Sequence, residues 1–386
     1  MAELLFWLSA GLVLYAYAGF PLLLLVRSRL CRQELRRAEI TPLVSFIVVA
    51  HNEATVIRQK LENLLALDYP RDRVSVLVAS DGSDDDTEAL VEGYAGRGVR
   101  LLALPRRGKI PALNAAVAQA AGDILVFSDA NSLYAPGALR ALVRPFADSA
   151  VGGVAGSQHY VTRAGGSRAA TGEHAYWNWD QRLKRWQSDA GSVTSATGAI
   201  YAIRRALFQP VPGGVGDDAL VSYRVVARGY RFVFEPEAVA YEALAQSSRA
   251  EFRRKVRVCL RGLRGLLAMP QLLNPFRYGF YSLQLFSHKL LRWLLAWPLI
   301  MLLLASLALW PAGPLYQMAA LVQVLFYGCA LAVYLLLREE RATSARAHLL
   351  TLPFYFCLAN TACLLAQWQL VRGRSIDAWE VQRAAE

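Results

Sequence analysis

Apolar positions form two kinds of pattern along this chain. Near the N-terminus, residues 4–26 are apolar and are interrupted only by small, aromatic or weakly polar residues. A run of this length predicts a helix that is long enough to cross the hydrocarbon core of a membrane. Near the C-terminus, three further runs have the same character, at residues 290–310, 315–337 and 349–371. The pattern therefore predicts membrane segments at both ends of the chain.

Between these ends, short β-branched runs alternate with segments of helical periodicity. The predicted strands are residues 43–50, 74–80, 99–104 and 124–128, and the predicted helices between them are residues 54–67, 86–94 and 110–121. Alternating strands and helices predict an α/β fold, with a mostly parallel sheet that carries helices on both faces. In such sheets, ligands bind beyond the carboxyl ends of the strands.

Composition supports a membrane protein with a large folded domain. Of the 386 residues, 55% are hydrophobic and only 19% are charged, which excludes intrinsic disorder. The net charge of +12 lies partly beside the apolar runs, from Arg27 to Arg37 and from Arg253 to Arg264. Basic residues at these places are typical of the cytoplasmic ends of membrane segments. No zinc-finger or helix-turn-helix motif is present, so nucleic acid is not an expected partner.

These observations divide the chain into five parts. We expect a retained transmembrane anchor at residues 1–27 and a cytoplasmic α/β domain at residues 42–250. Basic and aromatic helices at residues 251–289 are expected to lie in the membrane interface. Transmembrane helices follow at residues 290–371, with a tail at residues 372–386. The chain is thus predicted to be a multi-pass protein of the plasma or inner membrane.

Polar residues gather where the predicted strands end. Glu53, Asp81, Asp129 and Asn131 each follow a strand, and Lys109 stands at the start of a helix. Each of these residues taken alone is also typical of a turn or a helix cap. Glycine-rich dinucleotide and P-loop motifs are absent from the sequence. A rim of carboxylates without such a loop suits a ligand whose phosphates are held by Mg²⁺ or Mn²⁺.

Six short motifs resemble, in order, those of the family 2 glycosyltransferases. These are inverting enzymes with the Rossmann-like GT-A fold, and they include membrane-bound polysaccharide synthases. The motifs are AHNE at 50–53, DGSDD at 81–85, RGKIPALN at 107–114, SDAN at 128–131, TGAIYAIRR at 197–205 and GDD at 216–218. The resemblance extends over residues 42–264 and implies a GT-A catalytic domain joined to transmembrane helices.

The resemblance implies a catalytic base and a metal site. Inverting transfer needs a base that deprotonates the acceptor hydroxyl as it attacks the sugar. Asp218 takes that role, with its neighbour Asp217 as the less favoured candidate; a simple loop turn is the alternative for this motif. Asp129 is expected to bind a divalent metal. Asn131 stands where the family carries the second aspartate of its D-x-D motif, and its amide oxygen can also ligate a cation.

Nucleotide binding is assigned by the same resemblance. Ala50, Glu53, Asp81 and Lys109 belong to the motifs that surround the nucleotide, and the two acids would accept hydrogen bonds from the base or ribose. For Lys109, an exposed position at the start of a helix is the alternative. The predicted metal and nucleotide sites together imply a nucleotide-sugar donor, with UDP as the favoured carrier.

A basic segment corresponds to the Q-x-x-R-W motif of processive members. Aligning Arg257 with the arginine of that motif puts Arg254 at its glutamine and Val258 at its tryptophan. The arginines are candidates for binding the diphosphate. A basic face turned towards the membrane is the alternative. The absence of the tryptophan favours transfer of a single sugar over processive polymerisation.

The acceptor side is expected to include Gly198 and two tryptophans, Trp177 and Trp179. Sugar rings pack on aromatic faces, but tryptophans also anchor helices in lipid headgroups, so both interpretations remain open.

The leading interpretation is a membrane-embedded inverting glycosyltransferase that extends a growing polysaccharide at the cytoplasmic face of the membrane. One alternative is transfer of a single sugar to a lipid acceptor. A second alternative is a non-catalytic membrane transporter or scaffold. The expected partners are a nucleotide-sugar donor, a glycan or lipid acceptor and membrane lipids.

Overall fold

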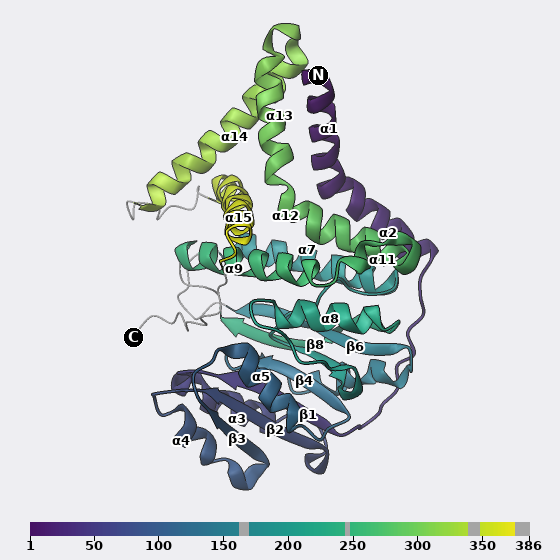
Figure 1. The fold of residues 1–386 in the computed structure, drawn as a ribbon, viewed down its shortest axis with the longest axis vertical. Helices are drawn as coiled ribbons and strands as arrows, with labels where there is room; N and C mark the ends of the chain where they lie inside the picture. Colours follow the sequence, from purple (N-terminus) through teal and green to yellow (C-terminus); the bar gives the residue numbers. More distant parts are fainter. Residues whose placement is uncertain (162–169, 244–247, 339–347, 375–386) are drawn as a thin grey trace.

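The computed structural model describes residues 1–161, 170–243, 248–338 and 348–374 of the chain. Within these ranges, the side chains of residues 170–178, 337, 338 and 348–351 are not described. An α/β domain lies at one end of the molecule, and long helices project from it at the other end (Figure 1).

A single eight-stranded sheet forms the centre of the α/β domain, with strand order β3-β2-β1-β4-β7-β6-β8-β5. Strands β3, β2, β1 and β4 are mutually parallel, β6 is parallel to β8, and the remaining pairs are antiparallel. The predicted α/β fold with a mostly parallel sheet is confirmed. The strands are β1 Val44–Ala50, β2 Val74–Asp81, β3 Val99–Leu104, β4 Ile124–Asp129, β5 Leu133–Tyr134, β6 Val151–Val161, β7 Tyr201–Arg204 and β8 Arg231–Ala243.

Helices cover both faces of this sheet because the central strands are apolar on both sides. All seven residues of β1 are buried, as expected for a parallel strand between two helical layers. The helices of the α/β domain are α3 Ala54–Leu65, α4 Thr87–Glu92, α5 Lys109–Ala118, α6 Ala138–Val143, α7 Ala170–Asp189, α8 Asp217–Ala227 and α9 Ser248–Leu267.

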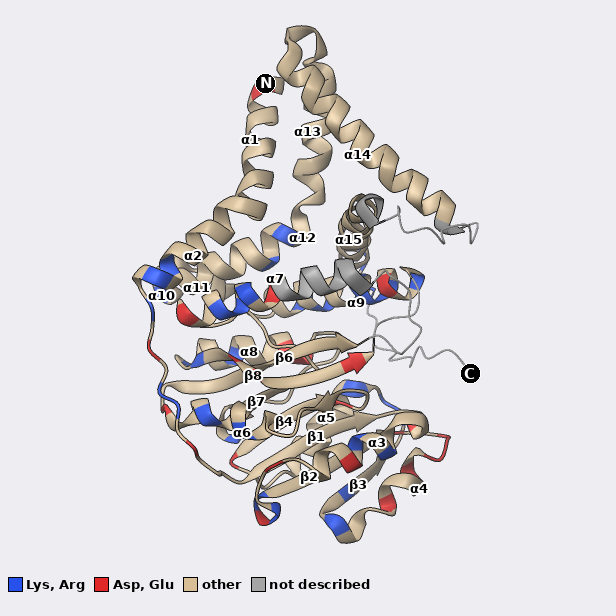
Figure 2. Cartoon of the chain, turned by 180° about the vertical axis from the view of Figure 1, so that it is seen from behind, with Lys and Arg blue, Asp and Glu red and all other residues tan. Residues whose placement is uncertain are grey.

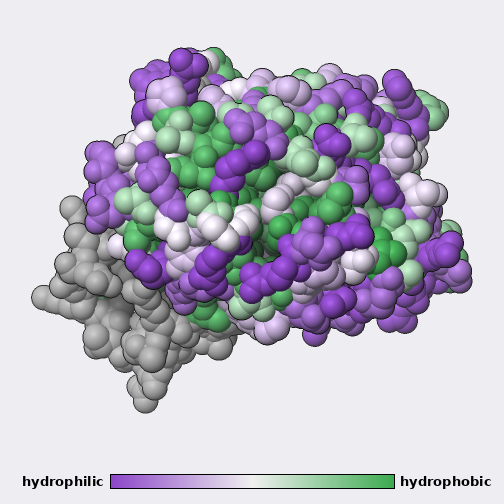
Figure 3. Space-filling view, turned by 90° about the horizontal axis from the view of Figure 1, so that it is seen from below, coloured by the Kyte–Doolittle hydropathy of each residue, from purple (hydrophilic) through white to green (hydrophobic). Residues whose placement is uncertain are grey.

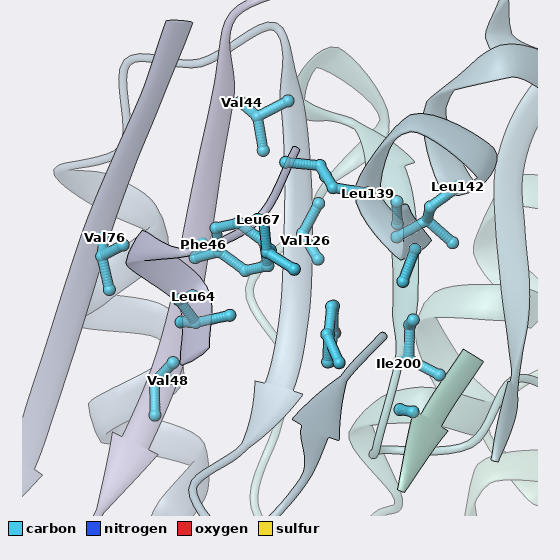
Figure 4. Close-up of a cluster of buried hydrophobic side chains, with 14 of the residues drawn as sticks. Val44, Phe46, Val48, Leu64, Leu67, Val76, Val126, Leu139, Leu142 and Ile200 are labelled. Carbon is cyan, nitrogen blue, oxygen red and sulfur yellow. The ribbon is translucent and has the colours of Figure 1, made fainter. Parts of the chain in front are cut away.

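Alternation along β1 divides the core into two clusters. Phe46 and Val48 point into a cluster with residues of α3 and α6, and Figure 4 shows Phe46 beside Leu64, Leu67 and Val126. Ile47, from the same strand, joins the cluster on the opposite face, which includes residues of α5 and α8. Successive side chains of a strand point to opposite faces, so one strand contributes to both cores. This packing fixes the ends of β1, β2 and β4 at one edge of the sheet.

Three helices within the described residues are long and apolar enough to cross a membrane: Ala2–Leu30, Pro314–Leu336 and Leu352–Val371. The first comprises α1 Ala2–Leu14, a π-helical turn at Tyr15–Gly19 and α2 Phe20–Leu30. The other two lie in α14 Pro314–Arg338 and α15 His348–Val371. Their positions agree with the apolar runs in the sequence.

The predicted segment at residues 290–310 differs from the structure. Its helix α13 covers only Ala296–Ala308, which is too short to cross a membrane by itself. The helical stretch Phe280–Leu294, which overlaps the predicted interfacial segment, meets α13 at an angle of 57°. The two stretches together are apolar enough for one bent span, and the boundary between interface and span at residue 290 stays a prediction. The stretch begins with α11 Phe280–Leu285, preceded by α10 Pro275–Tyr278, and contains a π-helical turn at Phe286–Leu291 and α12 Arg292–Leu294.

A layer of helices separates the sheet from the apolar helices. In Figure 1, α7, α9 and α11 lie between the sheet and the projecting helices α1, α13 and α14. Helix α15 packs on α9, and α1 packs on α13. Lysine and arginine residues gather in this layer and at the end of α2, whereas α1, α13 and α14 are nearly free of charge (Figure 2). Seen from the opposite end, the molecule shows hydrophilic residues around apolar patches (Figure 3). The charge distribution is therefore polarised along the molecule.

Candidate active site

Parallel pairing places the ends of three strands side by side. Ala50, the last residue of β1, pairs with Ser80 of β2, and Val49 pairs with Asp129 of β4. The residues that follow these strands therefore emerge at one edge of the sheet, as the sequence predicts. A cavity of about 410 Å³ lies instead at the amino ends of the strands, beside Pro42 and Ile124. The chemical groups, rather than this cavity, locate the candidate site.

Asp81 binds the segment that leads into α5. Its buried carboxylate accepts hydrogen bonds from the backbone N–H groups of Arg107 (2.7 Å) and Gly108 (2.9 Å) and pairs with the guanidinium of Arg106 (3.0 Å). The neighbouring Gly82 has a φ of +62°, and a Cβ there would lie 2.7 Å from the backbone nitrogen of Arg106. Asp81 thus shapes the loop that presents Lys109, while its predicted contact with the nucleotide stays a prediction.

Lys109 bridges two acidic parts of the site. Its Nζ lies 3.0 Å from Asp129 Oδ1 and 3.6 Å from Asp217 Oδ2. Burial alone would lower the pKa of Lys109, but the attraction of Asp129 and Asp217 raises it above the usual value. The ammonium group is consequently held at the strand ends beside two carboxylates. This geometry favours a place in the candidate site over a simple helix-start residue.

The two adjacent aspartates at the start of α8 have different surroundings. Asp217 is buried and faces Lys109, whereas Asp218 accepts a hydrogen bond from the backbone N–H of Ala219 (2.8 Å). Burial and the charge of Asp217 raise the pKa of Asp218 to about 6. A carboxylate with a pKa near 6 is largely ionised at neutral pH, yet it has a higher proton affinity than an ordinary aspartate. These properties suit a general base.

Tyr201 is a residue of the site that sequence reasoning did not single out, although it lies within the 197–205 motif. Its ring is fully buried and stacks on Phe127, with 4.6 Å between the ring centroids. Its hydroxyl has no hydrogen-bond partner in the described part of the chain. Burial raises the pKa of Tyr201, and the neighbouring Asp217, Asp218 and Asp129 raise it further. A neutral hydroxyl is thus placed beside the acidic groups.

Asp129 and Asn131 are the candidate metal ligands. The side chain of Asp129 is 33% exposed, and a Cβ on Gly198 would lie only 3.0 Å from its Oδ2. Glycine at position 198 therefore leaves open space beside the carboxylate. Among the described residues, no group of three or more His, Cys, Asp or Glu side chains is arranged to bind a metal. One carboxylate and one amide oxygen nevertheless fit a Mg²⁺ or Mn²⁺ ion whose remaining ligands are phosphate oxygens and water.

Two charged residues, the buried Lys60 and the half-buried Glu242, lie behind the turn that contains Asp129 and Asn131, and the sequence pattern did not reveal either of them. The amide nitrogen of Asn131 donates a hydrogen bond to Glu242 of β8 (3.0 Å). Lys60 of α3 is fully buried, and its ammonium group donates hydrogen bonds to Ser128 Oγ (2.6 Å) and to the carbonyl oxygen of Ser132. Burial lowers the pKa of Lys60 to about 7, against the opposing attraction of Asp129 and Glu242. The metal-site turn is thus held from two sides.

The two arginines assigned to the diphosphate differ in the structure. Arg254 is engaged within the protein, because its guanidinium pairs with both oxygens of Glu251 (2.7 and 2.9 Å) and with Tyr160 Oη (3.1 Å). Arg257 makes no hydrogen bond or ion pair with the described residues. Burial lowers the pKa of Arg257, as do the nearby Arg261 and Arg254, whereas Asp129 opposes this effect. Arg257 is therefore the better candidate for binding an incoming anion. Arg254 instead stabilises the fold through its contacts with Glu251 and Tyr160.

For the remaining predicted residues, the contacts in the described part of the chain give less support to the predicted role. The side chain of Ala50 is buried in the core, so only its backbone is available to a ligand. Glu53 is buried, and its backbone N–H donates to Thr87 Oγ1 (2.8 Å). Trp179 is 39% exposed and meets Trp186 edge to face, with a centroid separation of 5.7 Å. The side chain of Trp177 lies outside the described residues. The acceptor role of these tryptophans stays a prediction.

Comparison with known proteins identifies the family. Residues 42–264, more than half of the chain, match the sequence model described as "Glycosyltransferase like family 2". The chain belongs to this family. This family 2 glycosyltransferase is 28% identical over 229 residues to the probable glycosyltransferase YdaM of Bacillus subtilis. It is 25% identical over 222 residues to the poly-beta-1,6-N-acetyl-D-glucosamine synthase of Staphylococcus aureus.

These matches cover 56% and 55% of the chain, and 54% and 53% of the two relatives. The glycosyltransferase thus spans about half the length of the curated relatives that it matches. A solved mannosyltransferase from Pyrobaculum calidifontis, in complex with GDP-Man and Mn²⁺, has the same fold. The TM-score is 0.71 at 24% identity, and the match covers 97% of this chain and 100% of that one. The predicted GT-A architecture is confirmed by these findings.

Proposed function

We propose that this glycosyltransferase is a metal-dependent, inverting enzyme that transfers a sugar from a nucleoside-diphosphate donor to a growing polysaccharide at the cytoplasmic face of a membrane. The observation that carries the proposal is the separation of charge across the site. Lys109 and Asp129 define a side suited to metal and diphosphate, and Asp218 lies beyond Asp217 as a base of raised pKa. This arrangement matches the needs of an in-line attack on a sugar.

In the proposed reaction, Asp218 accepts the proton of the acceptor hydroxyl as that oxygen attacks the anomeric carbon. The bond from this carbon to the donor diphosphate breaks at the same time, and the configuration of the sugar inverts. Lys109 and Arg257 stabilise the negative charge that collects on the departing diphosphate. A divalent cation bound by Asp129 and Asn131 would supply further charge stabilisation for this leaving group.

Two features support placement at a membrane. The apolar helices project from the same side of the domain as the layer formed by α7, α9 and α11 (Figure 1). This layer carries many basic residues, which favours a position at the anionic surface of the cytoplasmic leaflet (Figure 2). An acceptor attached to the membrane, or emerging beside these helices, would reach the edge of the sheet at Asp218. UDP is the favoured nucleotide carrier because the motifs at residues 50–53 and 81–85 resemble uridine-binding segments.

A second candidate function is transfer of a single sugar to a lipid acceptor. Val258 occupies the position at which processive members carry tryptophan, and its side chain is 58% exposed on α9. A valine there provides no aromatic face on which a glycan chain packs as it is extended. The non-catalytic alternative is disfavoured, because the chain belongs to a glycosyltransferase family and retains both Asp217 and Asp218.

Product length distinguishes these functions. Full-length protein in lipid nanodiscs would be incubated with radiolabelled UDP- and GDP-sugars and Mn²⁺, and the products separated by size and by extraction into organic solvent. The leading proposal predicts a water-soluble polymer, and the second candidate predicts a labelled lipid of uniform size. The anomeric configuration of the product, measured by NMR, should be opposite to that of the donor. Retention of configuration, or label transfer that persists in the Asp218→Asn variant, would contradict the proposal.

A further inference from the structure

The metal-site turn, which contains Asp129 and Asn131, contacts a half-buried acid from a distant part of the chain. Glu242 lies near the end of β8, which pairs with β5 so that Leu133 is opposite Tyr241. This pairing brings Glu242 against Asn131, whose amide nitrogen donates a hydrogen bond to Glu242 Oε1 (3.0 Å). The other carboxylate oxygen of Glu242 accepts a hydrogen bond from the amide of Gln158. Both oxygens of the acid are thus bound by amide donors.

This arrangement fixes the orientation of the Asn131 side chain. An ionised carboxylate only accepts hydrogen bonds, so the NH₂ group of the asparagine must face it. In the structure, the amide nitrogen of Asn131 does face Glu242 Oε1. The carbonyl oxygen of Asn131 is then held on the other side of the amide, where it is available as a ligand.

Charge balance gives Glu242 a second effect. Two lysines, Lys60 and Lys109, lie close to Asp129, and each would repel an arriving cation. With asparagine at position 131, Asp129 is the only acid that the D-x-D position itself provides. Glu242 interacts electrostatically with Lys60 as well as with Asp129. Its negative charge offsets one of the lysines and makes the turn more favourable to a cation.

We propose that Glu242 is a positioning residue of the metal site, which orients Asn131 towards the cation and supplies the negative charge that a second aspartate would otherwise provide. This inference rests on the proposed function, because it requires that Asp129 and Asn131 bind a divalent cation. Outer carboxylates that orient a metal ligand commonly contribute about 10–100-fold to metal affinity. Glu242 would thus replace the charge of the missing aspartate while Asn131 remains the residue that contacts the cation.

The test measures Mn²⁺ binding rather than turnover. Full-length protein in lipid nanodiscs would be titrated with Mn²⁺ in the presence of UDP, and bound metal followed by electron paramagnetic resonance. In the Glu242→Gln variant, which keeps the shape of the side chain, we expect binding to weaken about 10–100-fold. In the double variant Asn131→Asp with Glu242→Gln, the acid and amide exchange places, and binding should return to within about threefold of the wild type. The matched control is Glu237→Gln, because Glu237 is exposed on the same strand and pairs with Arg144.

Each other outcome counts against the inference. If the Glu242→Gln variant binds Mn²⁺ as tightly as the wild type does, the role of Glu242 is overturned while the proposed function stays intact. No binding by the wild type would overturn both. The thermal unfolding midpoint of each variant distinguishes loss of fold from loss of the site. If the double variant unfolds like the wild type but still fails to bind Mn²⁺, the exchange of charge is refuted.

Discussion

Replacing Asp218 by asparagine should abolish catalysis and stabilise the protein at the same time. The substitution keeps the size of the side chain and an oxygen that accepts the N–H of Ala219 (2.8 Å), but it removes the charge. Loss of a general base typically lowers the rate by about 10²–10⁴-fold. The gain in stability follows from the raised pKa of Asp218, which shows that the folded protein disfavours the ionised carboxylate.

The size of this gain can be worked from the structure. A pKa raised from 3.8 to about 6 corresponds to at most about 3 kcal/mol of unfavourable free energy for the ionised form. Because the folded-state pKa is the higher one, this penalty is fully present above about pH 6. It falls to about half at pH 5 and disappears as the pH drops below 3.8. The Asp218→Asn variant should therefore exceed the wild type in unfolding midpoint by several degrees at pH 8, and by much less at pH 5.

The assay is thermal unfolding of both proteins in nanodiscs at the two pH values, beside nucleoside diphosphate release. Asp217→Asn is the comparison variant, because it relieves the same repulsion of Asp218 but also removes the carboxylate partner of Lys109. That variant should gain less stability than Asp218→Asn. An Asp218→Asn protein that is no more stable than the wild type at pH 8, or whose advantage is equal at both pH values, would refute the assignment of a destabilised base.

Further predictions concern the donor side of the site. Lys109→Ala should lower kcat/KM on the order of 10²-fold, because it removes a cation from the diphosphate position; steady-state kinetics at several donor concentrations check this. Arg257→Ala should raise the KM for donor, whereas Arg254→Ala should mainly lower the unfolding midpoint, since Arg254, unlike Arg257, is bound to Glu251. Equal effects of the two substitutions on KM would contradict the distinction. Gly198→Ala should weaken Mn²⁺ binding, because the new methyl group would lie 3.0 Å from a carboxylate oxygen of the metal site; unchanged Mn²⁺ affinity would refute this.

The parallel half of the sheet could be predicted from sequence because its signals are local. The runs at residues 43–50 and 99–104 are apolar and β-branched, and they become β1 and β3 with nearly the same bounds. Polar residues at the ends of such strands are brought together by parallel pairing alone. The positions of Asp81, Lys109 and Asp129 at one sheet edge followed from this rule.

The antiparallel half and its contribution to the site depend on contacts between distant residues. Glu242 reaches Asn131 only because β8 pairs with β5, and the sequence carries no local signal of that pairing. Lys60 occurs in a helix of ordinary amphipathic pattern, so its complete burial beneath Ser128 could not be expected. Arg254 meets Tyr160 across 94 residues of chain, which the basic pattern of α9 does not reveal.

The bend before α13 has a similar origin. Hydropathy indicates which residues are apolar, but it does not show where a helix changes direction. The π-helical turn at Phe286–Leu291 contains the buried His288, whose Nδ1 accepts a hydrogen bond from the side-chain amide nitrogen of Gln187 of α7 (2.9 Å). Tyr15 of the N-terminal helix also bonds to Ser287 in this turn (2.8 Å). These polar contacts tie the stretch to the α/β domain, so it diverges from the direction of the apolar helix that follows.

Release of nucleoside diphosphate is the measurement that tests the central claim most directly. Full-length protein in lipid nanodiscs would be supplied with a panel of UDP- and GDP-sugars, with Mg²⁺, Mn²⁺ or EDTA, beside the Asp218→Asn variant. The account predicts release from at least one donor, dependence on the divalent metal and loss of release in the variant, while the variant still binds the donor. Release that continues in EDTA, or that is equal in the variant, would contradict a metal-dependent transferase with Asp218 as its base.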